Sequence, residues 1–337
     1  MNYTEQQILI IGASGLVGSE LISILLEHGM QATNIIATAS KHSIGKVLNI
    51  EGNSIVLHPI HDDLFYSKPL VFQCASNEAA LKWTPIALDA GCTVIDCSST
   101  FRLNPEVPLT IPSVNSSSLE TSPTLVAGPN CTTIILLTAI HGIHMAFDIK
   151  GITVATYQSI SGAGKDGLRA LTDETNGKQR TSNGVFPEPC ALNVFCHESL
   201  VNPNTGFNSE EENVIDEIHK IWDDPDIQII PTCMRVPIVR VHTESITLTI
   251  RGLISEAEVL NALHNSTNVV VLNDEGNFPT ALKASCSDVV LVGHVRVVAG
   301  VNETTVSIVA CGDQIRTGAA LNAVRIAEKL FEISTKK

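Results

Sequence analysis

The stretch LIIGASGLVGSEL, residues 9–21, joins an apolar run to a segment with the hydrophobic spacing of a helix. Between them, Gly12, Gly15 and Gly18 form the pattern G-x-x-G-x-x-G. In a strand–turn–helix unit such glycines permit a tight turn, close approach of a pyrophosphate and close packing of the helix. Amide groups at the helix start would bind the phosphates. The stretch predicts a dinucleotide-binding βαβ unit, and a tight turn without a ligand is the alternative.

The rest of the first 130 residues continues this alternation of strand and helix patterns. Strand-like stretches lie at 34–40, 54–60, 69–76 and 92–99, and helix-like stretches at 15–29 and 77–91. Strands alternating with amphipathic helices predict a parallel sheet covered by helices.

Beyond Cys131 the pattern changes to long stretches rich in β-branched residues, at 149–164, 227–252 and 301–312, with helices expected around 209–222 and 255–264. This predicts an α+β domain with a mostly antiparallel sheet. A long amphipathic helix at 314–334 is expected to return to the first domain. The fold class is therefore α/β: a Rossmann-type domain of 1–131 and 313–337, and a second domain inserted over 132–312.

Composition limits the function classes. The 337 residues carry 21 Lys and Arg against 35 Asp and Glu, a net charge of −14, which argues against nucleic-acid binding. The N-terminus has no signal-peptide pattern, and no apolar run is long enough to span a membrane. Nine scattered cysteines without a C-x-x-C pair are typical of reduced thiols, so we expect a cytoplasmic protein.

The end of the second predicted strand bears on the cofactor. Enzymes that use NAD generally place an acid there, but none lies between Asn34 and Lys46. Hydroxyl and basic groups suited to a 2′-phosphate are present instead, from Ser40, Lys41, His42 and Ser43. The sequence favours NADP over NAD, with a solvated loop as the alternative.

A candidate nucleophile lies in GPNCTTIILLTAIHG, residues 128–142. Pro129 and Asn130 predict a turn, and Cys131 stands at the N-terminal edge of a helical pattern. The dipole and free amides at such a position favour a thiolate. A buried structural cysteine is the other interpretation.

A thiolate beside NADP suggests oxidation of an aldehyde through a thiohemiacetal and a thioester. This chemistry needs a general acid or base, for which His242 is the candidate, and a cation for an anionic substrate, such as Arg235. Residues seven apart on one strand point to opposite faces, so these two share a pocket only if Pro237 breaks the strand. A structural histidine is the alternative.

No metal site is predicted. His141 and His144 supply two ligands without a third, and Cys190, Cys196 and His197 lack the usual zinc spacings.

Seven motifs, in this order and at these separations, resemble the aspartate-semialdehyde dehydrogenase family along nearly the whole chain. They are GASGLVG (12–18), DCSSTFR (96–102), GPNCTT (128–133), YQSISGAG (157–164), EEEN (210–213), CMRVPIVRVHTES (233–245) and RTGAALNAVRIAE (316–328).

The resemblance implies NADP-dependent, reversible interconversion of L-aspartate-4-semialdehyde plus phosphate with L-4-aspartyl phosphate. This reaction belongs to the biosynthesis of lysine, threonine, methionine and diaminopimelate. The resemblance also implies a homodimer or homotetramer formed through the second domain, which is then the catalytic and dimerisation domain.

The implied site residues follow the motifs. Cys131 matches the nucleophile, His242 the acid/base and Gln158 the glutamine that places the substrate. Arg235 matches the residue for the substrate α-carboxylate, Glu210 that for its α-amino group, and Arg102 and Asn130 those for phosphate. The implied cofactor residues are Gly12, Ser14, Gly15, Leu16, Val17, Ser40, Lys41, His42, Ser43, Ser161, Gly162 and Gln314.

Three positions depart from the family pattern. Asn213 stands where the family has a phosphate-binding lysine, a loss worth about 1.5–3 kcal/mol for one charge-assisted bond. Lys165 or Lys220 could substitute for it. His42 stands where many members have an arginine, and Gln314 replaces a common asparagine.

Two other functions are weighed. N-acetyl-γ-glutamyl-phosphate reductase shares the thiol chemistry, but its cysteine usually lies in a G-C-Y-P-type setting, and Glu210 suits a free amino group. A non-catalytic nucleotide-binding paralogue is suggested by Asn213, but Cys131, Gln158, Arg235 and His242 together favour an enzyme.

Overall fold

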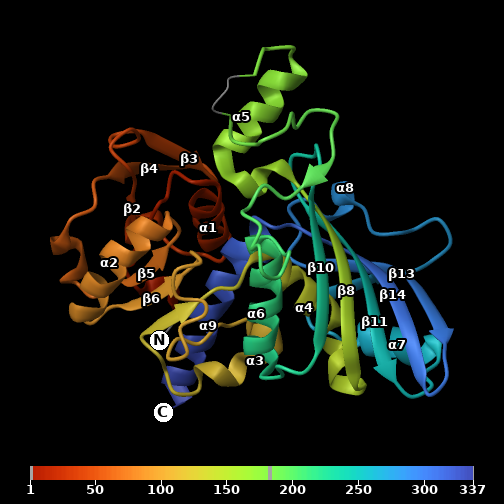
Figure 1. Cartoon of the computed structure of the whole chain (residues 1–337). Helices are drawn as coiled ribbons and strands as arrows, with labels where there is room; N and C mark the ends of the chain where they lie inside the picture. The colour runs from red at the N-terminus through yellow and green to blue at the C-terminus, as the bar shows by residue number, and fades with distance from the viewer. Residues whose placement is uncertain (1–2, 181–183, 337) are drawn as a thin grey trace. The chain divides into compact units, whose positions relative to one another are not determined.

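The computed structural model describes residues 3–180 and 184–336. Contacts within the chain divide it into two units. The first comprises Met1–Pro129 with Ala319–Lys337, and the second Asn130–Gly318. Each unit has its own sheet (Figure 1).

The first unit has a sheet in the order β3-β4-β2-β1-β5-β6-β7, parallel except for the pair β3 and β4. Its strands are β1 (Ile8–Ile11), β2 (Ile35–Thr38), β3 (Val47–Ile50), β4 (Asn53–His58), β5 (Leu70–Gln73), β6 (Thr93–Asp96) and β7 (Leu125–Ala127). In β1, Ile8 and Ile10 belong to one core, whereas Leu9 and Ile11 belong to another. The sheet is therefore buried on both faces, as a parallel sheet requires.

Helices form both cores of this unit. The α-helices of the unit are α1 (Leu16–Glu27), α2 (Asn77–Asp89), the short α3 (Pro112–Asn115), which belongs to neither core, and α9 (Leu321–Lys336). Helices α1 and α9 pack in the core of Ile8 and Ile10, while α2 packs in the core of Leu9 and Ile11. The predicted C-terminal helix begins later than expected, because Arg316–Ala320 form a π-helical turn. The Rossmann-type architecture predicted from the sequence is confirmed.

The second unit has a mixed, mostly antiparallel sheet in the order β12-β13-β14-β11-β8-β10-β9, as predicted. Its strands are β8 (Ile149–Gln158), β9 (Phe195–Cys196), β10 (Gln228–Arg235), β11 (His242–Arg251), β12 (Val269–Leu272), β13 (Val290–Ala299) and β14 (Glu303–Gly312). The stretch 227–252 is thus two strands, joined by a turn that contains Pro237.

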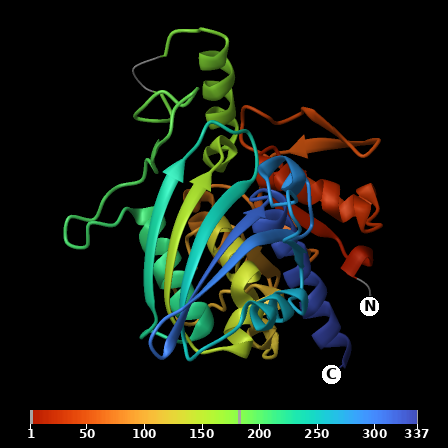
Figure 2. The same ribbon diagram turned by 90° about the vertical axis from the view of Figure 1, so that its right-hand side faces the viewer.

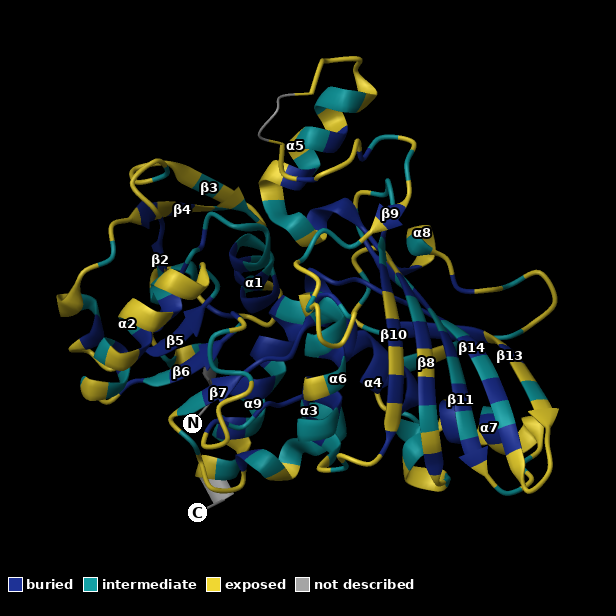
Figure 3. Cartoon of the chain, viewed as in Figure 1, coloured by how far each residue is buried: buried dark blue, intermediate teal, exposed yellow. Residues whose placement is uncertain are grey.

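Helices α4, α6 and α7 contact the strands of this sheet, and Figure 2 shows α4 and α6 behind it. The helices of the unit are α4 (Cys131–Ala146), α5 (Gly164–Thr175), α6 (Ser209–Trp222), α7 (Glu256–His264) and α8 (Ala281–Ala284). Exposure alternates along β8 and β10, where Tyr157 and Ile230 are 41% and 42% exposed (Figure 3). One face of the sheet is therefore covered by helices within the unit. Among the described helices, none has the length and apolarity to cross a membrane.

Candidate active site

The glycine-rich turn follows β1 in the first unit. Gly12 has a φ of +90°, and a Cβ there would lie 2.8 Å from the backbone of Cys74 and Ala75. A Cβ on Gly18 would lie 2.4 Å from the Gly12 carbonyl oxygen, so α1 packs directly on the turn. Gly15 is the N-cap of α1 and has no side chain to occupy the first-turn amides. This geometry suits a bound pyrophosphate.

The loop after β2 holds the predicted 2′-phosphate residues. Ser40, Lys41 and His42 are exposed, and Ser43 is half-buried. The amide of Ser43 donates to the Ser40 carbonyl, which closes a turn at the carboxyl end of the strand. The hydroxyl and basic groups are thus close in the chain and open to a ligand.

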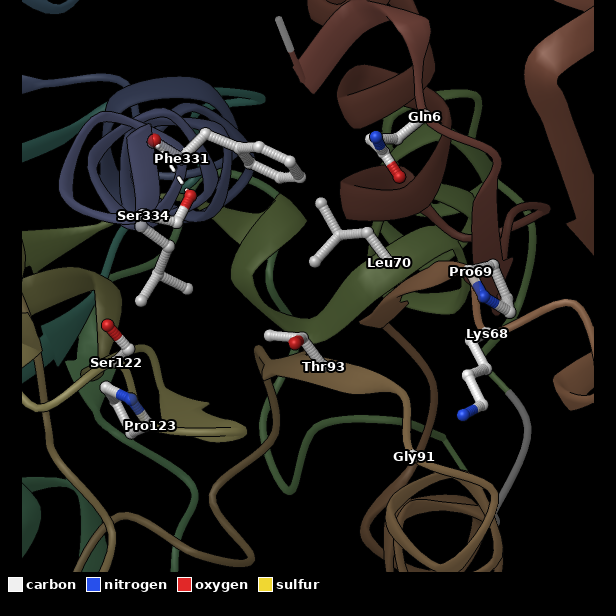
Figure 4. Close-up of a pocket in the computed structure, with 11 residues that line it drawn as sticks. Gln6, Lys68, Pro69, Leu70, Gly91, Thr93, Ser122, Pro123, Phe331 and Ser334 are labelled. Carbon is white, nitrogen blue, oxygen red and sulfur yellow. Dashed lines mark hydrogen bonds between the residues drawn. The ribbon is translucent and has the colours of Figure 1, made fainter. Parts of the chain in front are cut away.

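A separate pocket of about 240 Å³ lies in the first unit (Figure 4). Leu70 and Thr93, which line it, are the first residues of β5 and β6. The pocket is therefore at the amino ends of the parallel strands, whereas the glycine-rich turn follows the carboxyl end of β1. It is not the predicted dinucleotide site.

Arg102, a predicted phosphate residue, lies in the loop after β6. Its guanidinium donates to the Ser98 carbonyl at 3.1 Å and to the Cys97 carbonyl at 3.4 Å. Asp96 orders the same loop by accepting from the amide and the hydroxyl of Ser98. Burial raises the pKa of Asp96, although these hydrogen bonds and Arg102 act against the shift.

In the second unit, Cys131 is the first residue of α4. The Asn130 side chain caps the helix by accepting from the Thr132 amide at 2.8 Å. The Cys131 sulfur lies 3.5 Å from Nε2 of His242. A helix N-terminus and a ring nitrogen therefore both face the thiol, and both favour its thiolate form.

His242 begins β11 and has no exposed surface. The Ser159 amide donates to its Nδ1 at 3.1 Å, so the neutral ring carries its proton on Nε2, toward Cys131. Burial, and next the charge of Arg235 and the neighbouring His197 ring, lower the pKa of His242 well below its ordinary value. The ring is therefore a neutral hydrogen-bond donor to the sulfur at neutral pH.

Three polar side chains converge beside the thiol. Nε2 of Gln158 donates to the Thr132 hydroxyl at 2.8 Å and to Glu210 at 3.1 Å. Glu210, from the first turn of α6, also accepts from the Asn130 amide group at 3.0 and 3.1 Å. Four predicted site residues, Asn130, Cys131, Gln158 and Glu210, thus belong to one cluster.

Arg235 ends β10 and is 2% exposed. Its Nη1 donates to the Ser159 carbonyl at 2.9 Å, and Nη2 contacts His197 Nε2 at 2.7 Å. Nε and Nη2 donate to the two carboxylate oxygens of Glu198 at 3.1 and 2.6 Å. The guanidinium is therefore held as a buried cation by a bidentate ion pair.

Arg235 and His242 approach the same backbone, as the predicted break at Pro237 allows. A Cβ on Gly162 would lie 2.8 Å from Arg235 Nη1 and 3.6 Å from His242 Cε1. Val241, just before His242, has a φ of +82°, which a β-branched residue rarely adopts. Its amide donates to Gln314 at 2.7 Å, so Gln314 holds the strained residue beside the histidine.

The remaining predicted residues have local roles in the structure. Gln314 donates through its amide group to the hydroxyl of Ser161. Asn213 is half-buried on α6, one turn before the buried Glu217. Burial lowers the pKa of Lys220, a possible substitute cation on this helix, while Glu217 raises it.

Two family profiles match the chain. They are "Semialdehyde dehydrogenase, NAD binding domain" over residues 7–122 and "Semialdehyde dehydrogenase, dimerisation domain" over residues 140–317. Aspartate-semialdehyde dehydrogenase from Synechocystis sp. is 35% identical over 332 residues, which covers 97% of either chain.

The chain belongs to the aspartate-semialdehyde dehydrogenase family.

Solved structures of the family agree. Aspartate semialdehyde dehydrogenase II from Vibrio cholerae, complexed with ASA, is similar with a TM-score of 0.90 and 32% identity, over 97% of this chain and 98% of that one. A second structure of the Vibrio cholerae protein has the same TM-score and coverage at 33% identity. The chain contains the nucleotide-binding and dimerisation domains of the family.

Sequence analysis assigned no role in the site to three residues that hold it. Glu217, 1% exposed on α6, accepts from the Asn130 amide at 2.7 Å and so fixes the residue before Cys131. His197 and Glu198 hold Arg235 from the loop after β9. Their distance along the sequence from Asn130 and Arg235 gives no sign of these contacts. In the structure, β9 pairs Phe195 with Arg235, and this pairing brings the following loop to the guanidinium. His197 thus contacts Arg235. The sequence had predicted no metal site at this histidine.

Proposed function

We propose that the chain is an NADP-dependent aspartate-semialdehyde dehydrogenase, which interconverts L-aspartate-4-semialdehyde plus phosphate with L-4-aspartyl phosphate. The observation that carries the proposal is the Cys131 sulfur at the start of α4, 3.5 Å from Nε2 of the buried His242. Membership of the family supports the choice of substrate.

The contacts of the thiol suggest how it reacts. The Cys131 thiolate adds to the aldehyde carbon, and the Nε2–H group of His242 donates a hydrogen bond to the alkoxide of the thiohemiacetal. NADP held at the turn of Gly12 and Gly15 would supply the hydride acceptor that converts this adduct into a thioester. The alkoxide is already deprotonated when the hydride leaves, so this step needs no base. A neutral His242 that only donates a hydrogen bond is therefore sufficient. Phosphate then attacks the thioester carbonyl, and Cys131 leaves as a thiolate.

The second unit offers one anionic and one cationic side chain for the α-amino and α-carboxylate groups of the substrate. Glu210, which lies beside Gln158 and Asn130, would bind the α-amino group, and Arg235 the α-carboxylate. Arg102, Asn130 and Asn213 are the proposed phosphate residues. Gln158 would place the carbonyl carbon against the thiol.

The choice of NADP rests on the loop after β2, where Lys41 and His42 are exposed and no acid is present. Gly12, Ser14, Gly15, Leu16 and Val17 would hold the pyrophosphate at the start of α1. Ser161, Gly162 and Gln314 would contact the nicotinamide half. We also propose a cytoplasmic homodimer or homotetramer, in keeping with nine cysteines that form no disulfide within the described residues and with the dimerisation domain.

The test is the formation of NADPH by purified protein given L-aspartate-4-semialdehyde, NADP and a series of phosphate concentrations. We expect turnover that saturates with phosphate, and weaker turnover with NAD. Absence of turnover, from folded protein that binds NADP, would favour the non-catalytic paralogue.

A further inference from the structure

Arg235 has almost no free hydrogen-bonding capacity. A guanidinium has five N–H groups in a planar fork. One edge of the fork donates to Glu198 from Nε and Nη2, and the other edge contacts the Ser159 carbonyl and His197. An incoming carboxylate therefore meets a cation that already has a carboxylate partner.

A second carboxylate cannot simply join this pair. One guanidinium would then face two negative charges in a buried place, where like charges repel strongly. Burial raises the pKa of Glu198, but the hydrogen bonds and charge of Arg235 outweigh burial and lower it. Glu198 is therefore ionised at neutral pH and competes as a full anion.

The two partners differ in their freedom to move. The Arg235 side chain is 2% exposed and ends a strand paired on both sides, by β8 and β9. The Glu198 side chain is 18% exposed and lies in the loop beyond β9. Glu198 can turn to solvent, whereas Arg235 cannot leave the sheet.

We propose that Glu198 is an internal counter-ion that occupies the Arg235 fork in the free enzyme and has to leave it before a substrate carboxylate binds. The proposal rests on the proposed function, which assigns Arg235 to that carboxylate. Glu198 is a positioning and specificity residue, because it sets how strongly the enzyme selects an aldehyde with a carboxylate over one without it.

The first experiment compares wild type with Glu198→Gln on two substrates. L-Aspartate-4-semialdehyde carries the carboxylate, and 3-aminopropanal is the same molecule without it. The glutamine amide competes less strongly than the Glu198 carboxylate for the Arg235 guanidinium. We therefore expect KM for the semialdehyde to fall about tenfold in Glu198→Gln. Both kcat and KM for 3-aminopropanal should stay within about twofold of wild type. Glu188→Gln removes the same charge at an exposed position and should behave as wild type.

The second experiment needs no turnover. Calorimetry measures the binding of L-2-aminobutyrate, an unreactive analogue with both charged groups, and of n-propylamine, which lacks the carboxylate. We expect about tenfold tighter binding of aminobutyrate, and unchanged binding of propylamine, in Glu198→Gln. Glu198→Ala serves in both experiments if the glutamine variant does not fold.

The outcomes separate the two proposals. Unchanged or weaker binding of the carboxylate ligands in a folded Glu198 variant would overturn the counter-ion role. Absence of semialdehyde turnover in wild type, with tighter aminobutyrate binding in the variant, would overturn the proposed reaction and leave the counter-ion role standing.

Discussion

Two neighbouring rows of side chains on the second sheet show what sets the site apart. The site row consists of Arg235, Gln158 and His242, and the inner row of Cys233, Thr156 and Glu244. Each inner-row residue is two positions away on the same strand and hence on the same face. The site row is linked by hydrogen bonds to Glu198, Glu210 and Ser159.

The inner row is equally buried but lacks these partners. Both carboxylate oxygens of Glu244 and the Thr156 hydroxyl have no hydrogen-bond partner in the described chain. Burial raises the pKa of Glu244 well above its ordinary value and raises that of Cys233 as well. Arg235 in the site row is thus charged and has an ionised partner in Glu198, whereas the carboxyl group of Glu244 and the thiol of Cys233 in the inner row are neutral. The difference comes from their partners, because burial is common to both rows.

The largest effect is expected from Cys131→Ser, which tests whether the thiol of the site differs in reactivity from the inner-row thiol of Cys233. Turnover should fall at least about a thousandfold, because the hydroxyl is a much weaker nucleophile than a thiolate. NADP binding and the melting temperature should be retained. The matched control, Cys233→Ser, should keep kcat within about threefold while losing stability. Similar loss of turnover in both variants would place the chemistry elsewhere.

Substitutions of His242 sharpen its role within the site row. His242→Leu removes the Nε2 donor and should lower kcat by about a hundredfold to a thousandfold. His242→Gln places an N–H group at similar reach and should retain about ten times more activity than the leucine variant. Steady-state kinetics test the pair. Equal losses in the two variants would show that the ring has to accept a proton.

Glu244→Gln tests whether the inner row is neutral. With a raised folded pKa, the folded protein holds a proton that the unfolded chain releases above about pH 4.3. Wild type therefore loses up to about 1.4 kcal/mol of unfolding free energy per pH unit until the folded pKa is passed. The free energy of unfolding of the variant should therefore rise relative to that of wild type as pH increases. Urea titrations from about pH 5 to about pH 8 measure this difference. Parallel curves would mean that Glu244 has an ionic partner.

The smallest effect is expected from Asn213→Lys on α6, the helix that brings Glu210 to the site row. A restored cation should lower KM for phosphate about tenfold, as one charge-assisted bond would. Asn261→Lys adds the same charge at an exposed position of α7 and should change nothing. An unchanged KM in Asn213→Lys would show that another cation already serves the phosphate.

Much of the fold could be predicted from local patterns. The glycine spacing at 12–18 and the strand alternation specify the first unit, because turn geometry and sheet burial depend on nearby residues. The Cys131 turn was visible for the same reason. Pro237 indicated where β10 and β11 separate, but their register did not follow from the sequence.

The partners of the site residues could not be predicted. Glu198 reaches Arg235 only because β9 pairs with β10, and Glu217 reaches Asn130 from a helix far along the chain. Contacts between residues so far apart leave no regular pattern in the sequence from which they could be predicted. The burial of Glu244 did have a signal, since it shares the inward alternation of Ile246, Leu248 and Ile250 on β11.

The most direct test of the account is mass spectrometry of the protein mixed with L-aspartate-4-semialdehyde and NADP in the absence of phosphate. The account predicts an aspartyl thioester on the peptide that contains Cys131, lost on addition of phosphate and absent from Cys131→Ser. Turnover of the semialdehyde without an adduct, or with the adduct on another cysteine such as Cys233, would contradict it.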